Sequence, residues 1–533
     1  MEGSPKVLVK SIQRRLREGL NQEKNRSYNS RVNNLLAFKR VVAHFAPKMK
    51  EAILSDLGRS HFLTDFTEIG GIDDVIDYLL KNLKTFMADQ PRDISAMMAP
   101  SKAYVKPEPY GVTLILGSWN FPYATTLHPL VSAIAAGNVV CIKPSEMCPK
   151  SSAVMKEIID ALDQSVFACI EGGPEVAISV LEERWDLIVF TGSPEKGKLV
   201  AAAAAKHLTP TVLELGGKNP VVIDKDVDID NAAKRIVQGR YINAGQLCIA
   251  PDMAFVHASR IDEFLDKVRV TITEFYGPNP KLSKDYSRIV NEMHTRRIAS
   301  MLENHGGTVI CGGEVDVKEK YIAPTVILNP RKDVPLGCQE VFGPVLVVFP
   351  FNNIEECIEI INSREKPLAL YYFGNNKQNM ELLKNKTSSG NITWNDCIMH
   401  YTICDLPFGG VGNSGLSKMF GEEGFRAMSH AKSVLERGTN NRYPASVRFP
   451  PYTEEKQRTF NRLKGWMNFS LRSAKCNMKK AAVIAVIGFL AYQGYLNPVL
   501  SKLVEMKNVL TTIASGKANN YMLLSINHIH KTF

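Results

Sequence analysis

The chain has 533 residues, of which 45% are hydrophobic and 22% charged, a composition that excludes disordered, collagen-like and solenoid proteins. Such a length predicts two or three domains with large cores. There are 65 Lys and Arg against 54 Asp and Glu, and this net charge of +11 suggests an anionic partner, either nucleic acid or a membrane surface. Residues 436–533 hold 15 Lys and Arg against 4 Asp and Glu, so the first 435 residues are neutral. This distribution argues against a nucleic-acid groove on the main body, although a basic tail alone could bind RNA.

The N-terminal 95 residues have a helical pattern. Residues 1–20 lack an apolar signal segment, and their acidic residues argue against a mitochondrial presequence. The ten cysteines are scattered without a CxxC pair or a zinc-like His cluster, which predicts no metal site and a reducing, cytosol-facing compartment. The first helix is expected to place four apolar residues near one face: Val7, Ile12, Leu16 and Leu20.

From residue 110 the pattern changes to short apolar runs separated by helical segments and by loops rich in Gly and Pro. Helices are expected near 151–162 and 194–207. Strands alternating with helices predict βαβ units and a parallel sheet buried on both faces, as in a large α/β enzyme. The runs expected to form strands are 112–116, 139–142, 166–170, 187–190, 220–223, 253–257, 345–349 and 368–373.

A candidate phosphate site follows the strand that ends at Phe190. Gly192 allows a tight turn, Ser193 is a good N-cap and Pro194 suits the first helical position. The free N–H groups at such a helix start favour a phosphate, and Gly192 and Gly197 would let the backbone approach it closely. A plain strand–helix connection remains the alternative.

Three further features have weaker signals. The segment Gly410–Gly415 fits G-x-G-x-x-G formally, but no apolar strand precedes it, and we interpret it as a tight loop. Cys248 lies among small and polar residues, as a reactive cysteine requires, yet a buried structural cysteine is the commoner case. Glu214 ends an apolar strand, where it could act chemically, cap a helix or pair with a cation.

Seven motifs, in this order and at these spacings, resemble the aldehyde dehydrogenase superfamily. They are GSWNFP (117–122), KPSE (143–146), FTGSPEKG (190–197), LELGGKNP (213–220), GQLCIAPD (245–252), EVFGPVL (340–346) and LPFGGVGNSG (406–415). The APD after the cysteine, the short N-terminus and the basic C-terminal extension resemble its class 3 branch, which includes fatty aldehyde dehydrogenases. The resemblance spans about residues 5–435.

The resemblance implies a mechanism. Cys248 would be the nucleophile that forms a thiohemiacetal and then a thioester. Asn120, with the backbone N–H of Cys248, would form the oxyanion hole. Glu214 would be the general base for the water that hydrolyses the thioester. The implied substrates are medium- to long-chain fatty aldehydes, which are oxidised to carboxylic acids.

The resemblance also implies NAD as cofactor, with NADP as the alternative, and it implies no metal. Lys143 and Glu146 would lie near the adenosine ribose, where a carboxylate repels the 2′-phosphate of NADP. Glu340 would bind the nicotinamide ribose, and Phe342 would lie beside the ring. Glu195 and Lys196 depart from the usual residues of the phosphate loop, since relatives carry smaller or apolar ones. The pyrophosphate would bind at the residues Gly192, Ser193, Pro194, Glu195, Lys196 and Gly197.

The implied fold is α/β, with two parallel-sheet Rossmann-like domains, a small oligomerisation arm and a C-terminal helical membrane tail. The expected NAD-binding domain covers 1–213 with its helical N-terminus, the catalytic domain 214–415 and a return segment 416–435. A basic amphipathic tail would follow at 436–480, a candidate transmembrane anchor at 481–500 and an extension of unknown role at 501–533. The uncharged residues 481–500 would be about 30 Å long as a helix, enough to cross a bilayer.

The tail determines the expected location. Lysines before residue 481 favour a cytosolic catalytic domain that is anchored by its C-terminus and contacts membrane lipid. The endoplasmic reticulum is the first choice, and the mitochondrial outer membrane or the peroxisome are the alternatives. A homodimer is expected, with an aldehyde as small-molecule substrate and no nucleic-acid partner. Two other hypotheses remain: a CoA-acylating or semialdehyde dehydrogenase, and a non-catalytic membrane-bound scaffold on the same fold.

Overall fold

The computed structural model describes residues 5–94, 98, 101–439 and 445–467, and the predicted anchor and C-terminal extension lie outside them. The described residues form two compact units, the larger within 1–89 and 106–432 and the smaller within 90–105 and 433–467. Over these described ranges, no helix is both long and apolar enough to span a bilayer.

Helices open the chain, as predicted. Helix α1 buries Val9, Ile12, Leu16 and Gly19, whereas Val7 is 61% exposed, so the expected place of Val7 was wrong. The reason is that five helical residues turn through about 500°, which leaves Val7 roughly 140° from Ile12. The helical region also ends before residue 95, because residues 90–92 form a strand. The elements are α1 (Pro5–Asn21), α2 (Tyr28–Leu57), α3 (His61–Thr64), a π-helical turn η1 (Asp65–Ile69) and α4 (Gly70–Phe86).

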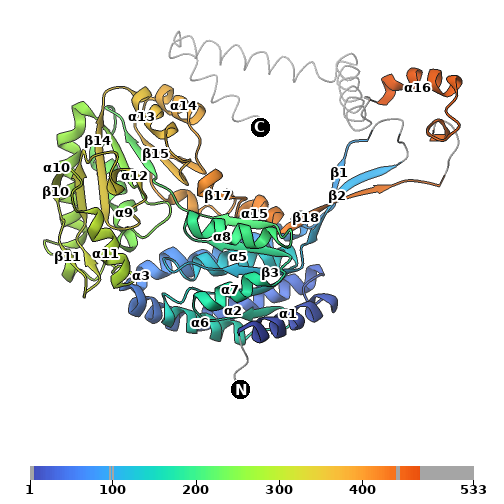
Figure 1. Ribbon diagram of the computed structural model, residues 1–533, viewed down its shortest axis with the longest axis horizontal. Coiled ribbons are helices and arrows are strands. Elements are labelled where there is room, and N and C mark those ends of the chain that lie inside the picture. Colours follow the sequence, from blue (N-terminus) through green and yellow to red (C-terminus); the bar gives the residue numbers. More distant parts are fainter. Residues whose placement is uncertain (1–4, 95–97, 99–100, 440–444, 468–533) are drawn as a thin grey trace, which may run out of the picture. The chain divides into compact units, whose positions relative to one another are not determined.

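The first large sheet has six strands in the order β17-β7-β6-β3-β4-β5. Strands β3 to β7 are parallel, and β17 is antiparallel to β7. Helices α1, α5, α6 and α8 pack against it (Figure 1). Its elements are β3 (Val112–Leu116), α5 (Ala124–Ala136), β4 (Val139–Lys143), α6 (Pro149–Asp160), β5 (Phe167–Cys169), α7 (Pro174–Glu182), β6 (Leu187–Thr191), α8 (Pro194–Ala205), β7 (Thr211–Glu214) and β17 (Gly415–Leu416).

The second large sheet has seven strands in the order β10-β13-β14-β9-β8-β15-β16, and only β10 in it pairs antiparallel. The predicted α/β fold with parallel sheets is therefore confirmed. The strands are β8 (Pro220–Ile223), β9 (Met253–His257), β10 (Thr308–Cys311), β13 (Thr325–Leu328), β14 (Val345–Phe351), β15 (Ala369–Phe373) and β16 (Asn391–Trp394). The helices around them are α9 (Ile229–Tyr241), α10 (Ile261–Tyr276), α11 (Glu292–Met301), α12 (Pro335–Cys338), α13 (Ile354–Asn362) and α14 (Lys377–Lys386), and α15 (Gly421–Ala427) comes later in the chain.

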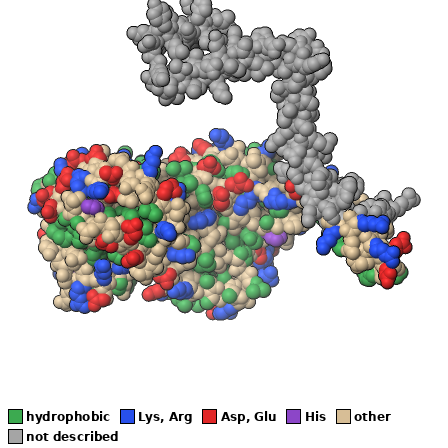
Figure 2. Space-filling view, turned by 90° about the horizontal axis from the view of Figure 1, so that it is seen from above, with side chains coloured by type: hydrophobic (Ala, Val, Ile, Leu, Met, Phe, Trp, Pro, Cys, Tyr) green, Lys and Arg blue, Asp and Glu red, His purple; other side chains and the backbone are tan. Residues whose placement is uncertain are grey.

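Two small sheets complete the described strands. One pairs β11 (Val315–Asp316) with β12 (Tyr321–Ile322), and the other has the order β1-β2-β18, with β1 (Gln90–Arg92), β2 (Lys102–Pro109) and β18 (Ser429–Glu436). Helix α16 (Glu454–Met467) belongs to the smaller unit. On the face shown in Figure 2, acidic and basic side chains are interspersed over the larger unit, in keeping with its balanced composition.

The chain passes between the two large sheets twice. It leaves the first sheet at Glu214, enters the second at Pro220 and returns to the first at Gly415, which pairs with Glu214. Residues near these crossings therefore lie between the sheets, and the candidate site is built from them. The predicted domain boundaries stay predictions.

Candidate active site

The order of the first sheet reverses between β3 and β6. From β3 the chain proceeds outward to β4 and β5, and it then returns to add β6 and β7 on the other side. In open parallel sheets, ligands bind at the carboxyl ends of the two strands where the order reverses. Here these ends lead into the loops that contain Asn120 and Ser193.

The loop after β6 has the geometry expected for binding an anion. Ser193 is the N-cap of α8, its Oγ accepts the N–H of Lys196 at 3.4 Å, and Pro194 is the first helical residue. The side chains of Ser193, Glu195 and Lys196 are exposed. The Thr191 hydroxyl, at the end of β6, is buried without a hydrogen-bond partner among the described residues. These features fit a dinucleotide pyrophosphate at the start of α8.

The two glycines of this loop lie close against neighbouring side chains. A Cβ on Gly192 would lie 2.4 Å from the Phe190 ring, and the Gly192 N–H donates to the Glu214 carbonyl at 3.0 Å. A Cβ on Gly197 would lie 2.7 Å from the Leu215 side chain. Close packing therefore requires a glycine at both positions, and the approach of these glycines to a phosphate stays a prediction.

Lys143 and Glu146 lie together at the carboxyl end of β4. Lys143 is buried, and its Nζ donates to the Pro144 carbonyl and to Glu146 Oε2, each at 3.1 Å. The side chain of Glu146 is 39% exposed. A ribose hydroxyl could replace one of these bonds, so the pair fits the adenosine end of a dinucleotide bound at these strand ends.

Cys248 lies in the loop between the 3₁₀ turn η3 (Ile242–Gly245) and β9 and is half-buried. Buried Asn219 fixes this loop: its amide donates to the carbonyls of Cys248 at 2.7 Å and Ala250 at 3.1 Å, and its Oδ1 accepts the Ala369 N–H at 2.8 Å. Burial, together with the charges of the Glu340 and Glu214 carboxylates, raises the pKa of the Cys248 thiol to about 12. The resting group is therefore a neutral thiol.

Glu214 ends β7 as a buried acid. Neither carboxylate oxygen has a hydrogen-bond partner among the described residues. Burial raises its pKa well above the usual range, and the charge of Lys418 opposes this only in part. A Cβ on Gly409 would lie 2.8 Å from Glu214 Oε1, so that glycine leaves room for the carboxylate. Buried polar groups without partners are rare and mark functional sites.

Glu340 and Phe342 lie on the loop before β14. Burial raises the pKa of Glu340 to about 8, with Asp252 adding to this effect and the Gly217 N–H opposing it. Phe342 has a positive φ of 48°, and its ring contacts the Trp119 ring edge to face at 5.4 Å between centroids. Both residues thus lie where the loop after β3 meets the second sheet.

Buried charges that the sequence analysis missed join this loop to the cysteine loop. Asp252 forms ion pairs with Lys218 and with Arg240, the latter at 3.4 Å, and its Oδ2 accepts the Val341 N–H at 3.0 Å. Arg240 also donates to the carbonyl of Gly343. These residues hold the Cys248 and Glu340 loops in one arrangement.

Asn120, after β3, reaches the same loop. Its Nδ2 donates to the carbonyl of Gln246 at 3.1 Å, two residues before Cys248. Because an amide has two hydrogens, this bond leaves one for a second acceptor. The structure therefore brings Asn120 to the cysteine loop, where it can serve as an oxyanion donor.

An aromatic cluster, also missed, surrounds Tyr401. The charges at Cys248 and Glu214 both raise the pKa of the Tyr401 hydroxyl beyond the effect of burial, so Tyr401 lies near both groups. Its ring contacts Phe408 at 4.9 Å and Phe420 at 5.1 Å, and its hydroxyl bonds to His128 Nδ1 at 3.0 Å. The members come from α5 and from residues 401–420, and no sequence spacing relates them.

The segment Gly410–Gly415 is a tight loop, as interpreted from the sequence. It contains the 3₁₀ turn η7 (Gly412–Ser414), and a Cβ on Gly410 would lie 2.0 Å from the Ser414 carbonyl oxygen. Its glycines close the loop on itself and bring Gly415 to the strand of Glu214.

Comparisons with known proteins agree with this geometry. The model of the aldehyde dehydrogenase family matches residues 6–434. Aldehyde dehydrogenase family 3 member A2 of Rattus norvegicus is 42% identical over 83% of this chain and 91% of its own length. The dimeric, NADP-preferring aldehyde dehydrogenase of the same species is 38% identical over 82% and 96%.

Solved structures match as well. The substrate-bound state of Staphylococcus aureus AldH has a TM-score of 0.82 at 34% identity, covering 85% of this chain and 99% of that one. The NAD+ complex of the Bacillus cereus aldehyde dehydrogenase has a TM-score of 0.73 at 25% identity, covering 81% and 89%. The chain therefore belongs to the aldehyde dehydrogenase family and is an NAD(P)-dependent enzyme that oxidises aldehydes to carboxylic acids.

Proposed function

We propose that the chain oxidises medium- to long-chain fatty aldehydes, with Cys248 as nucleophile, Asn120 as oxyanion donor and Glu214 as general base. The observation that carries the proposal is the buried carboxylate of Glu214. Its two oxygens have no hydrogen-bond partner within the part of the chain that the structure describes, and its charge raises the pKa of Cys248. A carboxylate that is free of hydrogen bonds and raised in pKa is suited to accept a proton near neutral pH.

The chain's own groups account for the covalent steps. The Cys248 thiol gives its proton to solvent water and its sulfur attacks the aldehyde carbon, while the Asn120 amide and the Cys248 N–H bind the developing oxyanion. When bound, NAD(P) accepts a hydride from the adduct. Glu214 then takes a proton from the water that attacks the thioester, and the acid is released while the thiol is restored.

Residues at the carboxyl ends of β4 and β6 and before β14 would hold the cofactor. Ser193 at the start of α8 would face the pyrophosphate, the Lys143–Glu146 pair the adenosine ribose and Glu340 the nicotinamide ribose. Phe342 would lie beside the nicotinamide. The carboxylate of Glu146 favours NAD over NADP, because it repels a 2′-phosphate. Glu146→Gln should therefore lower the NAD preference in paired assays with the two cofactors.

The apolar surroundings of Tyr401 support an alkyl-chain substrate. Phe408 and Phe420 are buried aromatic neighbours of Tyr401, which lies near Cys248. Each methylene group buried there adds about 0.8 kcal/mol to binding. Reduced-cofactor formation measured from acetaldehyde to octadecanal should give kcat/KM values that rise with chain length, and a flat series contradicts the proposal.

Two variants test the chemistry. Cys248→Ala should abolish formation of reduced cofactor, whereas Cys357→Ala, at a buried cysteine on α13, should retain it. Glu214→Gln should retain one burst per site and lose turnover. Wild-type rates in Cys248→Ala would reject Cys248 as the nucleophile. No reduced cofactor from the unsubstituted chain would support a scaffold, and strict dependence on CoA for acyl release would support a CoA-acylating enzyme.

The membrane attachment and its location are part of the proposal. The net charge of +11 in residues 436–533 and the uncharged residues 481–500 support a C-terminal anchor. In the smaller unit, Phe449, Tyr452 and Phe460 are exposed among basic residues, as at a lipid surface. We place the catalytic part on the cytosolic side, first at the endoplasmic reticulum, with the mitochondrial outer membrane or the peroxisome as alternatives. The full chain should sediment with anionic vesicles far more completely than a 1–470 truncation, which keeps these aromatic residues but lacks 481–500. Equal sedimentation of the two would reject the anchor.

A homodimer is proposed as well. The three-stranded sheet β1-β2-β18 supports an oligomerisation arm, and one relative is named as dimeric. Light scattering of the purified chain tests this, and a monomeric mass over the working concentration range would reject it.

A further inference from the structure

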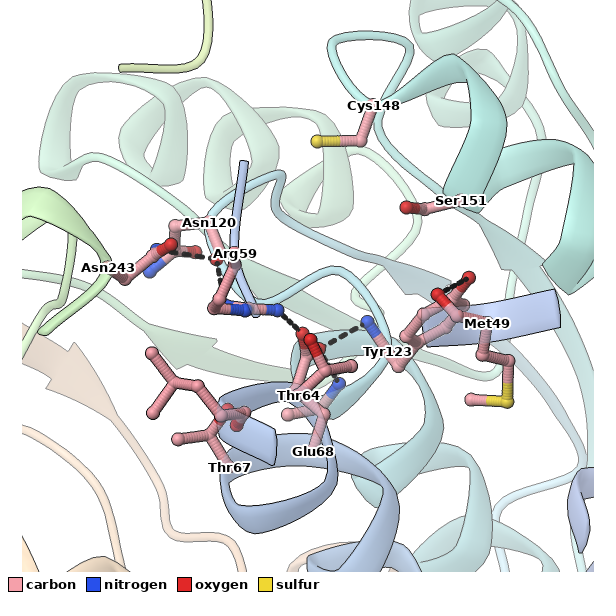
Figure 3. A network of polar contacts seen from close by, with 12 residues as sticks. Met49, Arg59, Thr64, Thr67, Glu68, Asn120, Tyr123, Cys148, Ser151 and Asn243 are labelled. Carbon is pink, nitrogen blue, oxygen red and sulfur yellow. Dashed lines mark hydrogen bonds and ion pairs between the residues drawn. The ribbon is translucent and has the colours of Figure 1, made fainter. Parts of the chain in front are cut away.

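A buried ion pair lies behind Asn120. Arg59 follows Gly58, the C-cap of α2, and Glu68 lies in the π-helical turn η1. Both side chains are 0% exposed and contact each other directly. Figure 3 shows the Arg59 guanidinium between Glu68 and Asn120. Neither residue belongs to a motif of the sequence analysis.

The Arg59 guanidinium binds two acceptors at once. Its Nη2 donates to Glu68 Oε1, and its Nη1 donates to the backbone carbonyl of Asn120 at 3.2 Å. The plane of the group also covers the Phe121 ring, 4.6 Å from its centroid. A rigid, planar fork can hold two acceptors in fixed geometry, which a lysine ammonium does not do.

Glu68 uses its second oxygen at the start of α5. Its Oε2 accepts the N–H groups of Tyr123 at 2.7 Å and Ala124 at 2.9 Å. A carboxylate there satisfies two amides that the helix leaves without partners. The segment from Asn120 to Ala124 is therefore held at its first carbonyl by Arg59 and at its last amides by Glu68.

Asn120 is joined to the segment 243–248 that leads to Cys248 by two hydrogen bonds, one in which it donates and one in which it accepts. Its Nδ2 donates to the Gln246 carbonyl, and the Asn243 amide donates to the Asn120 carbonyl at 2.9 Å. Asn243 has a positive φ of 52°, an uncommon conformation for a residue other than glycine. The carbonyl that Arg59 binds is thus one that sets the place of Asn120 relative to Cys248.

Stability alone is a weak reason for this arrangement. A buried ion pair gains little over well-packed apolar residues, because both charges must leave water. The π-helical turn that carries Glu68 is a rare conformation that is frequent at functional sites. Both observations favour a role in the reaction.

We propose that Arg59 and Glu68 are positioning residues, which hold Asn120 so that its free amide hydrogen meets the oxyanion formed on Cys248. The proposal rests on the oxyanion role given above to Asn120. It assigns the pair no contact with substrate, since both act through the backbone of residues 120–124.

The first test replaces Arg59 by Lys, which keeps the charge beside Glu68 but loses the second, simultaneous bond. Acylation of Cys248 is followed with para-nitrophenyl acetate, without cofactor, as the burst of released nitrophenolate. Loss of an oxyanion donor in Asn120→Ala should lower the acylation rate about 10²–10³-fold. Arg59→Lys should lower the rate at saturating ester about 10-fold, because a donor displaced by a fraction of an ångström keeps part of its effect.

The deciding measurement is the double variant Arg59→Lys/Asn120→Ala. If Arg59 acts through the Asn120 amide, the lysine should cause no further loss once that amide is absent, so the two effects do not multiply. Effects that multiply would overturn the inference and leave the oxyanion role of Asn120 intact. A wild-type acylation rate in Asn120→Ala would instead reject the proposed function itself.

Arg31→Lys is the matched control. Arg31 is another buried arginine, and it binds the opposite end of α5 through the Ala135 carbonyl at 3.0 Å. It should leave acylation unchanged, whereas an equal loss there would attribute the Arg59 effect to general loosening of α5. Glu68→Gln is the second variant, should Arg59→Lys not fold. Its amide oxygen can still accept from Tyr123 and Ala124, but its NH2 group cannot accept from Arg59. We expect a similar loss of acylation together with a lowered unfolding temperature, so the rate is measured well below that temperature.

Discussion

The reactivity of the Cys248 thiol should depend on the protonation of Glu340. The charge of Glu340 is the first cause after burial that raises the pKa of Cys248 to about 12. Glu340 itself has a pKa of about 8, so its carboxyl is neutral below pH 8 and charged above it. Glu340→Gln fixes the neutral state at every pH, and we expect it to make the thiol more reactive only above pH 8.

The structure sets the size of the effect. A thiol with a pKa of about 12 is ionised in roughly one molecule in 10⁴ at pH 8, four units lower. A free cysteine with a pKa of about 8.5 is about one quarter ionised at that pH, so Cys248 should be alkylated roughly 10³-fold more slowly. Each unit by which Glu340→Gln lowers the thiol pKa raises the rate tenfold above pH 8.

The assay is alkylation of the unliganded enzyme by iodoacetamide, over about two units on either side of the Glu340 pKa. The label on the peptide containing Cys248 is counted by mass spectrometry. Cys311, half-buried on the edge strand β10, is the internal reference. The wild-type profile should bend near pH 8 and the variant profile should not. Superimposable profiles, or a thiol as reactive as free cysteine, would refute the reasoning.

Three further outcomes are expected. Asn219→Ala leaves the carbonyls of Cys248 and Ala250 and the N–H of Ala369 without their hydrogen-bond partner. It should therefore lower the free energy of unfolding by about 3–6 kcal/mol in denaturant titrations. A loss below about 1 kcal/mol would contradict the stabilising role of these three hydrogen bonds. Gly409→Ala, at a φ of 153°, puts a Cβ 2.8 Å from Glu214 Oε1, so it should slow thioester hydrolysis more than acylation in single-turnover assays; equal slowing would argue against a displaced carboxylate. Burial lowers the pKa of His128 to about 3, so the unfolded chain binds its proton first as pH falls below 6.5. Stability should therefore fall by about 2 kcal/mol between pH 6.5 and pH 5, and His128→Asn should remove that slope.

Much of the fold follows from local pattern. The apolar runs at 112–116, 220–223 and 253–257 are strands with those bounds, because fully buried parallel strands need continuous apolar sequence. Strand β13 was missed, although its four residues are as many as those of the predicted strand β8. Strand β16 was missed because it is half-exposed and has no apolar run.

The residues of the candidate site were likewise only partly predictable from the sequence. Cys248, Glu214 and Asn120 came from the motif resemblance, since no spacing in sequence brings three distant loops together. Arg59 and Glu68 were not predicted as site residues, because a charged residue in a helical region is expected at the surface. Their burial exists only once α3, η1 and α5 are packed. Asn219 differs, because it lies inside a recognised motif, and only its three hydrogen bonds reveal its task.

The contact between Gly245 and Gly343 bears on how such a chain can change over generations. A Cβ on Gly245 would lie 2.3 Å from the Gly343 carbonyl oxygen, a contact of backbone with backbone that no side-chain rotation relieves. A single substitution of Gly245 by any residue with a Cβ would therefore displace the backbone of the loop that contains Gly343. The rings of Phe408 and Phe420 contact other aromatic side chains, which can shift, so these residues can be exchanged singly. Single substitutions around Tyr401 can therefore change the range of substrates, while the backbone contact between Gly245 and Gly343 stays the same.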